Sequence, residues 1–158
     1  MTCRPPNLFA ALAVGFTLAL VDAAPAQNQQ LSKIEVENVR RVFHNGQHNA
    51  FTDLIRWNGK FWLTFRSCPD GHMVFPTSRI IVLASEDTES WQQVHEFSVP
   101  RRDTRDPHFL VFLDQLFVYT GTWFSGDRGL PREQYNINKH LGYGVRTTDG
   151  KNWSEPFH

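Results

Sequence analysis

The chain has 158 residues, with 16 Lys and Arg against 16 Asp and Glu, so its formal net charge at pH 7 is zero. This length is sufficient for one domain. The balanced charge, with no basic face, gives no indication of a nucleic-acid or membrane partner.

The N-terminus has the composition of an export signal. Arg4 precedes an apolar stretch at residues 8–21, and Ala24-Pro25-Ala26 fits a small-residue cleavage site. The apolar stretch is too short to favour a membrane span. We therefore expect residues 1–26 to be a signal peptide and residues 27–158 to be the mature protein, either secreted or periplasmic.

Short apolar and aromatic runs, separated by turn residues, make up the rest of the chain and indicate an all-β protein. Asn58-Gly59, between two such runs, favours a tight hairpin turn. The predicted strands, in chain order, are 33–43, 50–57, 60–66, 79–85, 91–98, 108–113, 115–121 and 141–147, with another starting at Trp153.

Two turns share one pattern. Residues 85–91 read SEDTESW and residues 147–153 read TTDGKNW, and the second lies 62 residues after the first. The matching positions are Ser85, Asp87 and Trp91 in the first turn, and Thr147, Asp149, Gly150 and Trp153 in the second. Repeated four-stranded units of this kind are blades of a β-propeller. We expect blade one at about 49–99 and blade two at about 105–158, with a β-sandwich as the alternative.

The two turns resemble the Asp box, Ser-x-Asp-x-Gly-x-Thr-Trp, of the sialidase (neuraminidase) superfamily, also called the BNR repeat. Both are one residue shorter than that pattern, and the first lacks its Gly. The resemblance implies that the turns are structural, since the Asp caps the hairpin and the Trp packs beneath it. It also implies a six-bladed propeller, of which this chain would be an N-terminal part. The missing blades would then come from the rest of a longer chain.

The stretch 48–67 also resembles the opening blade of sialidase-like proteins. A sialidase opens this blade with Arg-Ile-Pro, and Ala50-Phe51-Thr52 stands there in this chain. The first arginine of the sialic acid site is therefore absent. The Tyr and Glu of the sialidase mechanism come from later blades and have no counterpart here.

Successive turns of an antiparallel blade alternate between its two ends. The long polar loops therefore share the end opposite the Asp turns, where binding groups are expected. The candidate catalytic acids near that end are Asp53, Asp70 and Asp106. For Asp53 the alternative is a solvent-facing position, for Asp70 a turn-forming role, and for Asp106 a brace between blades. Arg105-Asp106-Pro107 is similar to a motif of five-bladed furanosidases, in which the Asp helps to bind the sugar.

The candidate substrate-binding residues are His48, Arg66, Arg79, Arg105 and Trp123. Arginine offers a planar fork that matches a carboxylate. For Arg66 and Arg79 the alternative is a salt bridge to Asp53 or Asp106, and for Trp123 it is inward packing. His44 and His48 lack a third ligand, so we expect no metal, and we expect no cofactor.

Three functions remain open from the sequence. The first is an exported, exo-acting, sialidase-like glycoside hydrolase with a glycan substrate, in which Asp53 or Asp70 is the candidate proton donor. The second is a non-catalytic propeller that binds glycans or proteins. The third is a five-bladed furanosidase-type hydrolase, supported by the Arg105-Asp106-Pro107 motif alone.

Overall fold

The structure is a computed structural model that describes residues 33–158, so the expected signal peptide lies outside the described residues. The chain divides into a unit ending at Glu37 and a compact unit, Asn38–His158, that holds every strand. The strand predicted at 33–43 is wrong: these residues pair with no other strand, and Ile34, Val36 and Val39 remain exposed. No helix within residues 33–158 is long and apolar enough to span a bilayer.

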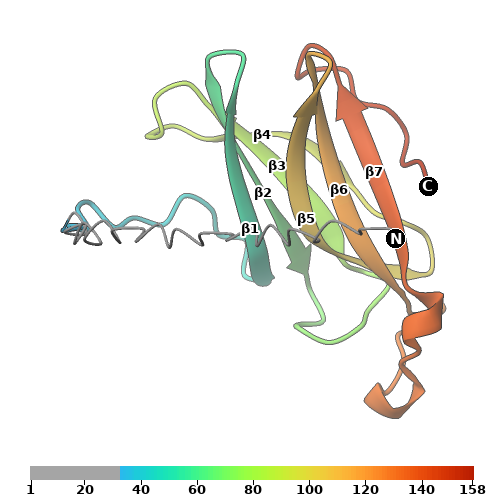
Figure 1. Cartoon of the computed structure of the whole chain (residues 1–158). Helices are drawn as coiled ribbons and strands as arrows, with labels where there is room; N and C mark the ends of the chain where they lie inside the picture. The colour runs from blue at the N-terminus through green and yellow to red at the C-terminus, as the bar shows by residue number, and fades with distance from the viewer. Residues whose placement is uncertain (1–32) are drawn as a thin grey trace, which may run out of the picture. The chain divides into compact units, whose positions relative to one another are not determined.

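The first sheet is an antiparallel meander of four strands (Figure 1). In chain order these are β1 (His48–Trp57), β2 (Lys60–Cys68), β3 (Arg79–Ser85) and β4 (Gln92–Phe97). The turn between β1 and β2 is the predicted one, because Asn58 and Gly59 both have positive φ, as a type I′ turn requires.

The second sheet has three antiparallel strands, β5 (Arg102–Phe112), β6 (Gln115–Phe124) and β7 (Leu141–Thr147). Between β6 and β7 lie two short 3₁₀ turns, η1 (Arg132–Gln134) and η2 (Ile137–Lys139). The described residues are therefore all-β apart from these two turns. β5 begins six residues before the strand predicted at 108–113, because its first half pairs with the last residues of β6.

The segment after β7 turns back along that strand. Trp153 forms a bridge with Thr147, and Phe157 forms one with Gly144. The expected start of a fourth strand at Trp153 is therefore present as two isolated bridges rather than as a continuous strand.

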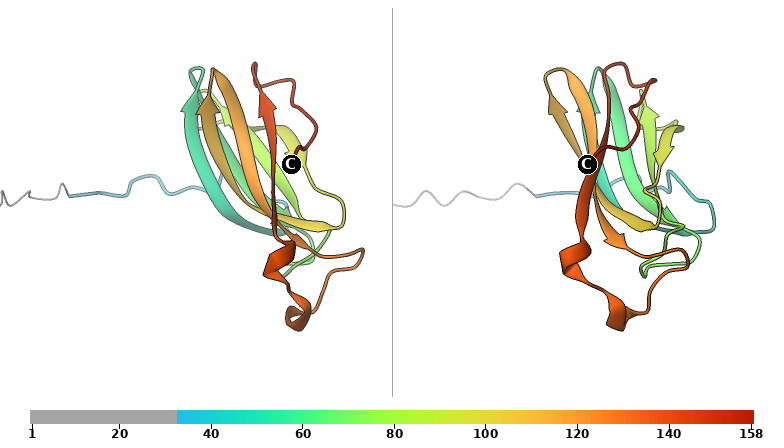
Figure 2. Two further views of the ribbon diagram at one scale, coloured as in Figure 1. Left: turned by 45° about the vertical axis from the view of Figure 1, so that its right-hand side comes forward. Right: turned by 90° about the vertical axis from the view of Figure 1, so that its right-hand side faces the viewer.

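The two sheets lie side by side and bury an apolar core between them (Figure 2). Alternation along each strand places one set of side chains in this core and the other set on the far face. The core consists of Trp57, Trp62, Ile80, Val82 and Phe97 from the first sheet and Leu116, Val118 and Val145 from the second. Burying each such side chain contributes about 1.5–3 kcal/mol, so this contact is the main source of the unit's stability.

The two Asp turns share the hydrogen bonds of the Asp and of the hydroxyl two residues before it, but the indole N–H of Trp91 donates to the Thr88 carbonyl whereas that of Trp153 has no partner within residues 33–158. Asp87 Oδ1 accepts the backbone N–H groups of Glu89 and Ser90, both at 2.8 Å. Asp149 Oδ1 accepts those of Lys151 and Asn152 at the same distance. In each turn the hydroxyl of the preceding Ser or Thr lies 3.1 Å from the Asp Oδ1 and accepts two further N–H groups.

Both Asp turns lie at the same end of the sheets as the short hairpin turns at 58–59 and 113–114 (Figure 1). The longer loops, at 43–47, 69–78 and 125–140, lie at the opposite end. The predicted separation of turns from loops is therefore present. A ligand site is expected at the loop end, where the longer loops lie.

Candidate functional site

Matching bulges interrupt β1 and β5, which lie next to each other. The pairing shifts between Ala50 and Asp53 in β1, and between Arg105 and His108 in β5. Each bulge contains one residue in the left-handed region, Phe51 with φ 61° and Asp106 with φ 53°. Bulges redirect side chains and are frequent beside active sites, so the two bulges mark a candidate site.

Beneath the bulges lies a buried ion network. Asp103 and Arg66 are both fully buried, and Arg66 Nε donates to Asp103 Oδ1 at 3.0 Å. Arg105 donates to the other oxygen, Asp103 Oδ2, through Nε at 3.0 Å and also through Nη2. One carboxylate thus holds two guanidinium groups, one from each sheet. A buried charge without such a partner would be strongly destabilising.

The two arginines also hold the loop between β2 and β3. Arg66 donates to the carbonyl oxygens of Gly71 and Met73, each at 3.0 Å. Arg105 Nη2 donates to those of His72 and Met73 at 3.1 and 3.0 Å. These four hydrogen bonds fix the backbone that carries His72.

The loop holds His72 against the residues of the first bulge. The centroid of the His72 ring lies 5.1 Å from that of the His48 ring and 5.6 Å from that of the Phe51 ring. Burial lowers the pKa of His48, and the nearby charges of Arg66 and Arg105 lower it further. His48 is therefore neutral at pH 7, and its Nδ1 is buried without a hydrogen-bond partner.

We name as the bulge site the contacting residues His48, Phe51, Arg66, His72, Asp103 and Arg105, together with Asp106, which lies in the second bulge next to Arg105 in the chain. Asp106 is half-buried, and its carboxylate forms no hydrogen bond or ion pair with any residue in 33–158. Arg105 Nη1 likewise has no partner in the described part of the chain, and the guanidinium lies 5.9 Å from the Phe51 ring centre. The Asp106 carboxylate and Arg105 Nη1 are thus polar groups of the bulge site with no side-chain or backbone partner in the described residues.

The other two predicted acids are engaged in protein contacts. Asp53 Oδ2 accepts the backbone N–H of Phe109 at 2.8 Å and lies 3.8 Å from His108 Nδ1, so it links β1 to β5. This contact explains why an acidic residue, Asp53, occurs within an otherwise apolar strand. Asp70 is exposed and accepts a hydrogen bond from the Thr77 hydroxyl at 2.5 Å.

The alternative considered for Arg66 and Arg79, a salt bridge to Asp53 or Asp106, is wrong about the partner, because both arginines pair with other acids. Arg66 pairs with Asp103 rather than with Asp53 or Asp106, and no part of its side chain is exposed. Arg79 pairs with Glu96 at 3.5 Å and donates to Gln47 at 3.1 Å.

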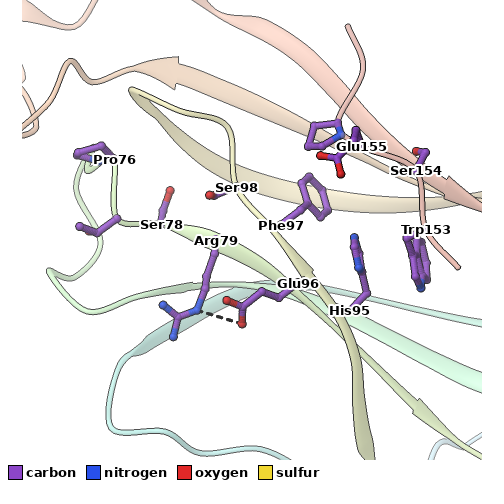
Figure 3. A pocket seen from close by; sticks show the side chains of 12 residues that line it. Pro76, Ser78, Arg79, His95, Glu96, Phe97, Ser98, Trp153, Ser154 and Glu155 are labelled. Atoms are coloured by element: carbon purple, nitrogen blue, oxygen red, sulfur yellow. Dashed lines mark ion pairs between the residues drawn. The ribbon is translucent and has the colours of Figure 1, made fainter. Parts of the chain in front are cut away.

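Arg79 belongs to a different feature from the bulge site. It lines a cavity of about 520 Å³ between β4 and the segment 153–156 (Figure 3). There the His95 ring stacks on that of Trp153 at 4.7 Å between centroids, and burial lowers the pKa of His95. Both rings are part of the lining of this cavity.

Trp123 lies at the loop end, on the second sheet. Its ring centre is 5.9 Å from that of Tyr135 and 5.2 Å from that of His140. The Tyr135 hydroxyl accepts the backbone N–H of Val74 at 3.1 Å, which attaches the 125–140 loop to the loop that carries His72. No group of three or more side chains able to hold a metal ion occurs within residues 33–158.

Sequence reasoning missed three members of the bulge site: Phe51, His72 and Asp103. Asp103 and Arg105 stand two apart in a strand and therefore share a face, a signal that could have identified their contact. His72 gives no such signal, because its position depends on hydrogen bonds from two distant arginines.

Comparisons with known proteins found distant similarities to solved structures. No family model matches the chain, and no curated protein matches it in sequence. One similar structure is Zg3597, a family 117 glycoside hydrolase from the marine bacterium Zobellia galactanivorans, at 15% identity and a TM-score of 0.49. Another comes from Parabacteroides distasonis ATCC 8503, is described provisionally as a glycoside hydrolase, and matches at 13% identity and a TM-score of 0.43. Each similarity covers 68% of this chain, which spans only 37% and 32% of the two structures.

Proposed function

We propose that the bulge site binds a carbohydrate and that the protein is a sialidase-like glycoside hydrolase acting on a terminal sugar. The observation that supports this most directly is Asp106. It places an unpaired carboxylate on a left-handed backbone within a strand. Strained backbone of this kind persists where the surroundings hold it in place, and it gathers at functional sites.

The neighbours of Asp106 suit a sugar. Phe51 and His72 offer ring surfaces at the loop end, and a sugar's C–H face packs well on such rings. Arg105 Nη1 can donate to a hydroxyl or an acidic substituent. The bound sugar would then lie between an aromatic wall and a carboxylate.

In the proposed reaction Asp106 is the acid or base that handles a proton at the glycosidic oxygen or at water. The Arg66–Asp103–Arg105 network keeps both bulges rigid, so the carboxylate is positioned before the ligand arrives. Asp53 and Asp70 keep their roles as weaker candidates, because other protein groups already occupy their oxygens.

A specific observation favours a second candidate, a glycan-binding protein without catalysis. Glycoside hydrolysis ordinarily requires two carboxyl groups. Among the three acids predicted for the site, only Asp106 forms no hydrogen bond or ion pair with other residues in 33–158. If no second acid acts with it, the site binds the sugar and leaves the glycosidic bond intact.

The test is a screen of the protein against terminal sialosides, uronides and furanosides, with both hydrolysis and binding measured. Asp106→Asn should reduce hydrolysis by about 10²-fold or more, the usual contribution of a general acid or base. The matched control is Asp114→Asn, since Asp114 also has positive φ, 60°, but lies in a hairpin turn at the other end. Unchanged hydrolysis in Asp106→Asn would remove that residue from the mechanism, and binding without hydrolysis would select the second candidate.

A further inference from the structure

One imidazole joins the two sheets where β4 meets the segment after β7. His95 lies near the end of β4, which is an edge strand of the first sheet, and its ring stacks on the indole of Trp153. The two ring planes are 5° apart, with 4.7 Å between centroids. Figure 3 shows the rings side by side in the wall of the cavity. The stack is therefore a contact between the first sheet and the segment 153–157.

Few backbone hydrogen bonds hold this segment to its own sheet. The N–H of Ser154 donates to the Arg146 carbonyl, and Gly144 and Phe157 exchange two N–H···O bonds, all at 2.9 Å. They form isolated bridges rather than a continuous strand. Backbone with so few hydrogen bonds opens locally at a lower free energy than central strands do. The side-chain contact of Trp153 with the first sheet therefore helps to keep the segment in place.

The imidazole of His95 lies where a positive charge has no hydrogen-bond acceptor. Its Nε2 is buried and has no partner within residues 33–158. The Trp153 ring covers one side, and the centroid of the Phe97 ring lies 5.9 Å from that of His95. Both nitrogens of a protonated imidazole are donors, and a buried donor without an acceptor is costly. Protonation of His95 therefore opposes the stack.

The charged groups around His95 are Glu96 on its own strand, Glu155 on the facing segment and Arg79 on β3. Both glutamates raise the pKa of His95, and the face of an indole also attracts a cation. The two glutamates are exposed, so water screens their charges, and Glu96 is paired with Arg79. Burial is the larger effect, and it keeps the pKa of His95 below its ordinary value of 6.5.

We propose that the His95–Trp153 stack is a pH-sensitive contact: neutral His95 holds the segment 153–157 against the first sheet, and protonated His95 releases it. Release separates Trp153 from β4 and opens the cavity between them. Once the segment is released, water reaches the imidazole, which then titrates at its ordinary pKa of 6.5. The contact is therefore at full strength above pH 6.5 and weakens as the pH falls below that value.

Amide hydrogen exchange, followed by NMR at about pH 7.5 and about pH 5.5, tests this proposal. Protection factors already correct for the intrinsic pH dependence of exchange. Those of the Ser154 and Phe157 amides should fall by up to about tenfold at the lower pH, which is about one unit below the ordinary pKa of histidine. Those of the β2 amides should not change between the two pH values.

Two variants assign the effect to His95. His95→Phe keeps an aromatic stack but cannot be protonated, so its protection factors at Ser154 and Phe157 should be the same at both pH values. The matched control is His44→Phe, because His44 is an exposed histidine of the 43–47 loop; it should show the wild-type fall.

Glu155→Gln provides a test that leaves both stacked rings intact. It removes a charge that raises the pKa of His95, so the fall in protection at the lower pH should become larger. Equal protection at both pH values in the wild type would overturn the proposal, as would a wild-type fall in His95→Phe. A fall in Glu155→Gln no larger than that of the wild type would also overturn it.

Discussion

Substituting the residue after the aspartate in each Asp turn should change the free energy of unfolding by an amount that the structure predicts. Gly150 has φ 73°, and the left-handed region costs a residue with a β-carbon about 1–2 kcal/mol. A β-carbon at 150 would also collide with the Trp62 ring, whose Cζ2 would lie 2.9 Å away, and overpacking costs about 1–3 kcal/mol. We expect Gly150→Ala to lower the free energy of unfolding by about 2–5 kcal/mol.

The first turn supplies the reverse experiment. Thr88 occupies the equivalent position with φ 64°, so Thr88→Gly relieves strain of about 1–2 kcal/mol. The gain is offset by about 0.4–1 kcal/mol, because glycine makes the unfolded chain more flexible. The net effect should be a stabilisation of about 0.5–1 kcal/mol. The assay is urea unfolding followed by tryptophan fluorescence, and changes of the same sign in the two variants would refute the equivalence of the turns.

Three further predictions concern the acids. Backbone N–H groups hold the pKa of Asp149 well below its usual range. The stabilisation by the charged carboxylate is therefore complete above the unfolded-state pKa of 3.8, and it is lost as the pH falls toward the folded-state pKa. The stability difference between wild type and Asp149→Ala should therefore shrink when urea unfolding is repeated at lower pH, below 3.8. Asp103→Ala should cost about 3–5 kcal/mol in urea unfolding, because it leaves Arg66 buried without its partner. Asp53→Ala should cost about 1–3 kcal/mol in the same assay, through the lost acceptor for Phe109 N–H.

Local signals in the sequence predicted the parts of the fold that depend on neighbouring residues. Asn58-Gly59 and the two Asp turns are determined by backbone conformation and nearby hydrogen bonds, so they could be found without knowledge of the rest. The strand at 33–43 failed because an alternating apolar pattern forms a strand only where a partner strand lies beside it. β5 was predicted too short because Pro107 indicated a strand start, whereas the structure accommodates it in a bulge.

The site was predicted only in part, because some of its contacts depend on how the two sheets pack against each other. Residues with a distinctive charge, such as Arg66, Arg105 and Asp106, were identified, and they lie toward the loop ends of β2 and β5. Which acid would pair with Arg66 depends on how β2 of the first sheet meets β5 of the second. That relation arises from packing between sheets, so the sequence could not supply it.

We propose that the bulged ends of β1 and β5 form one ligand site. It is tested most directly by mapping backbone amide chemical shifts while a saccharide that binds in the screen is added. We expect the largest shift changes at Phe51, His72 and Asp106, with those of Asp114 and Gly150 unchanged. Changes concentrated at the hairpin end, with none at the bulges, would contradict the claim.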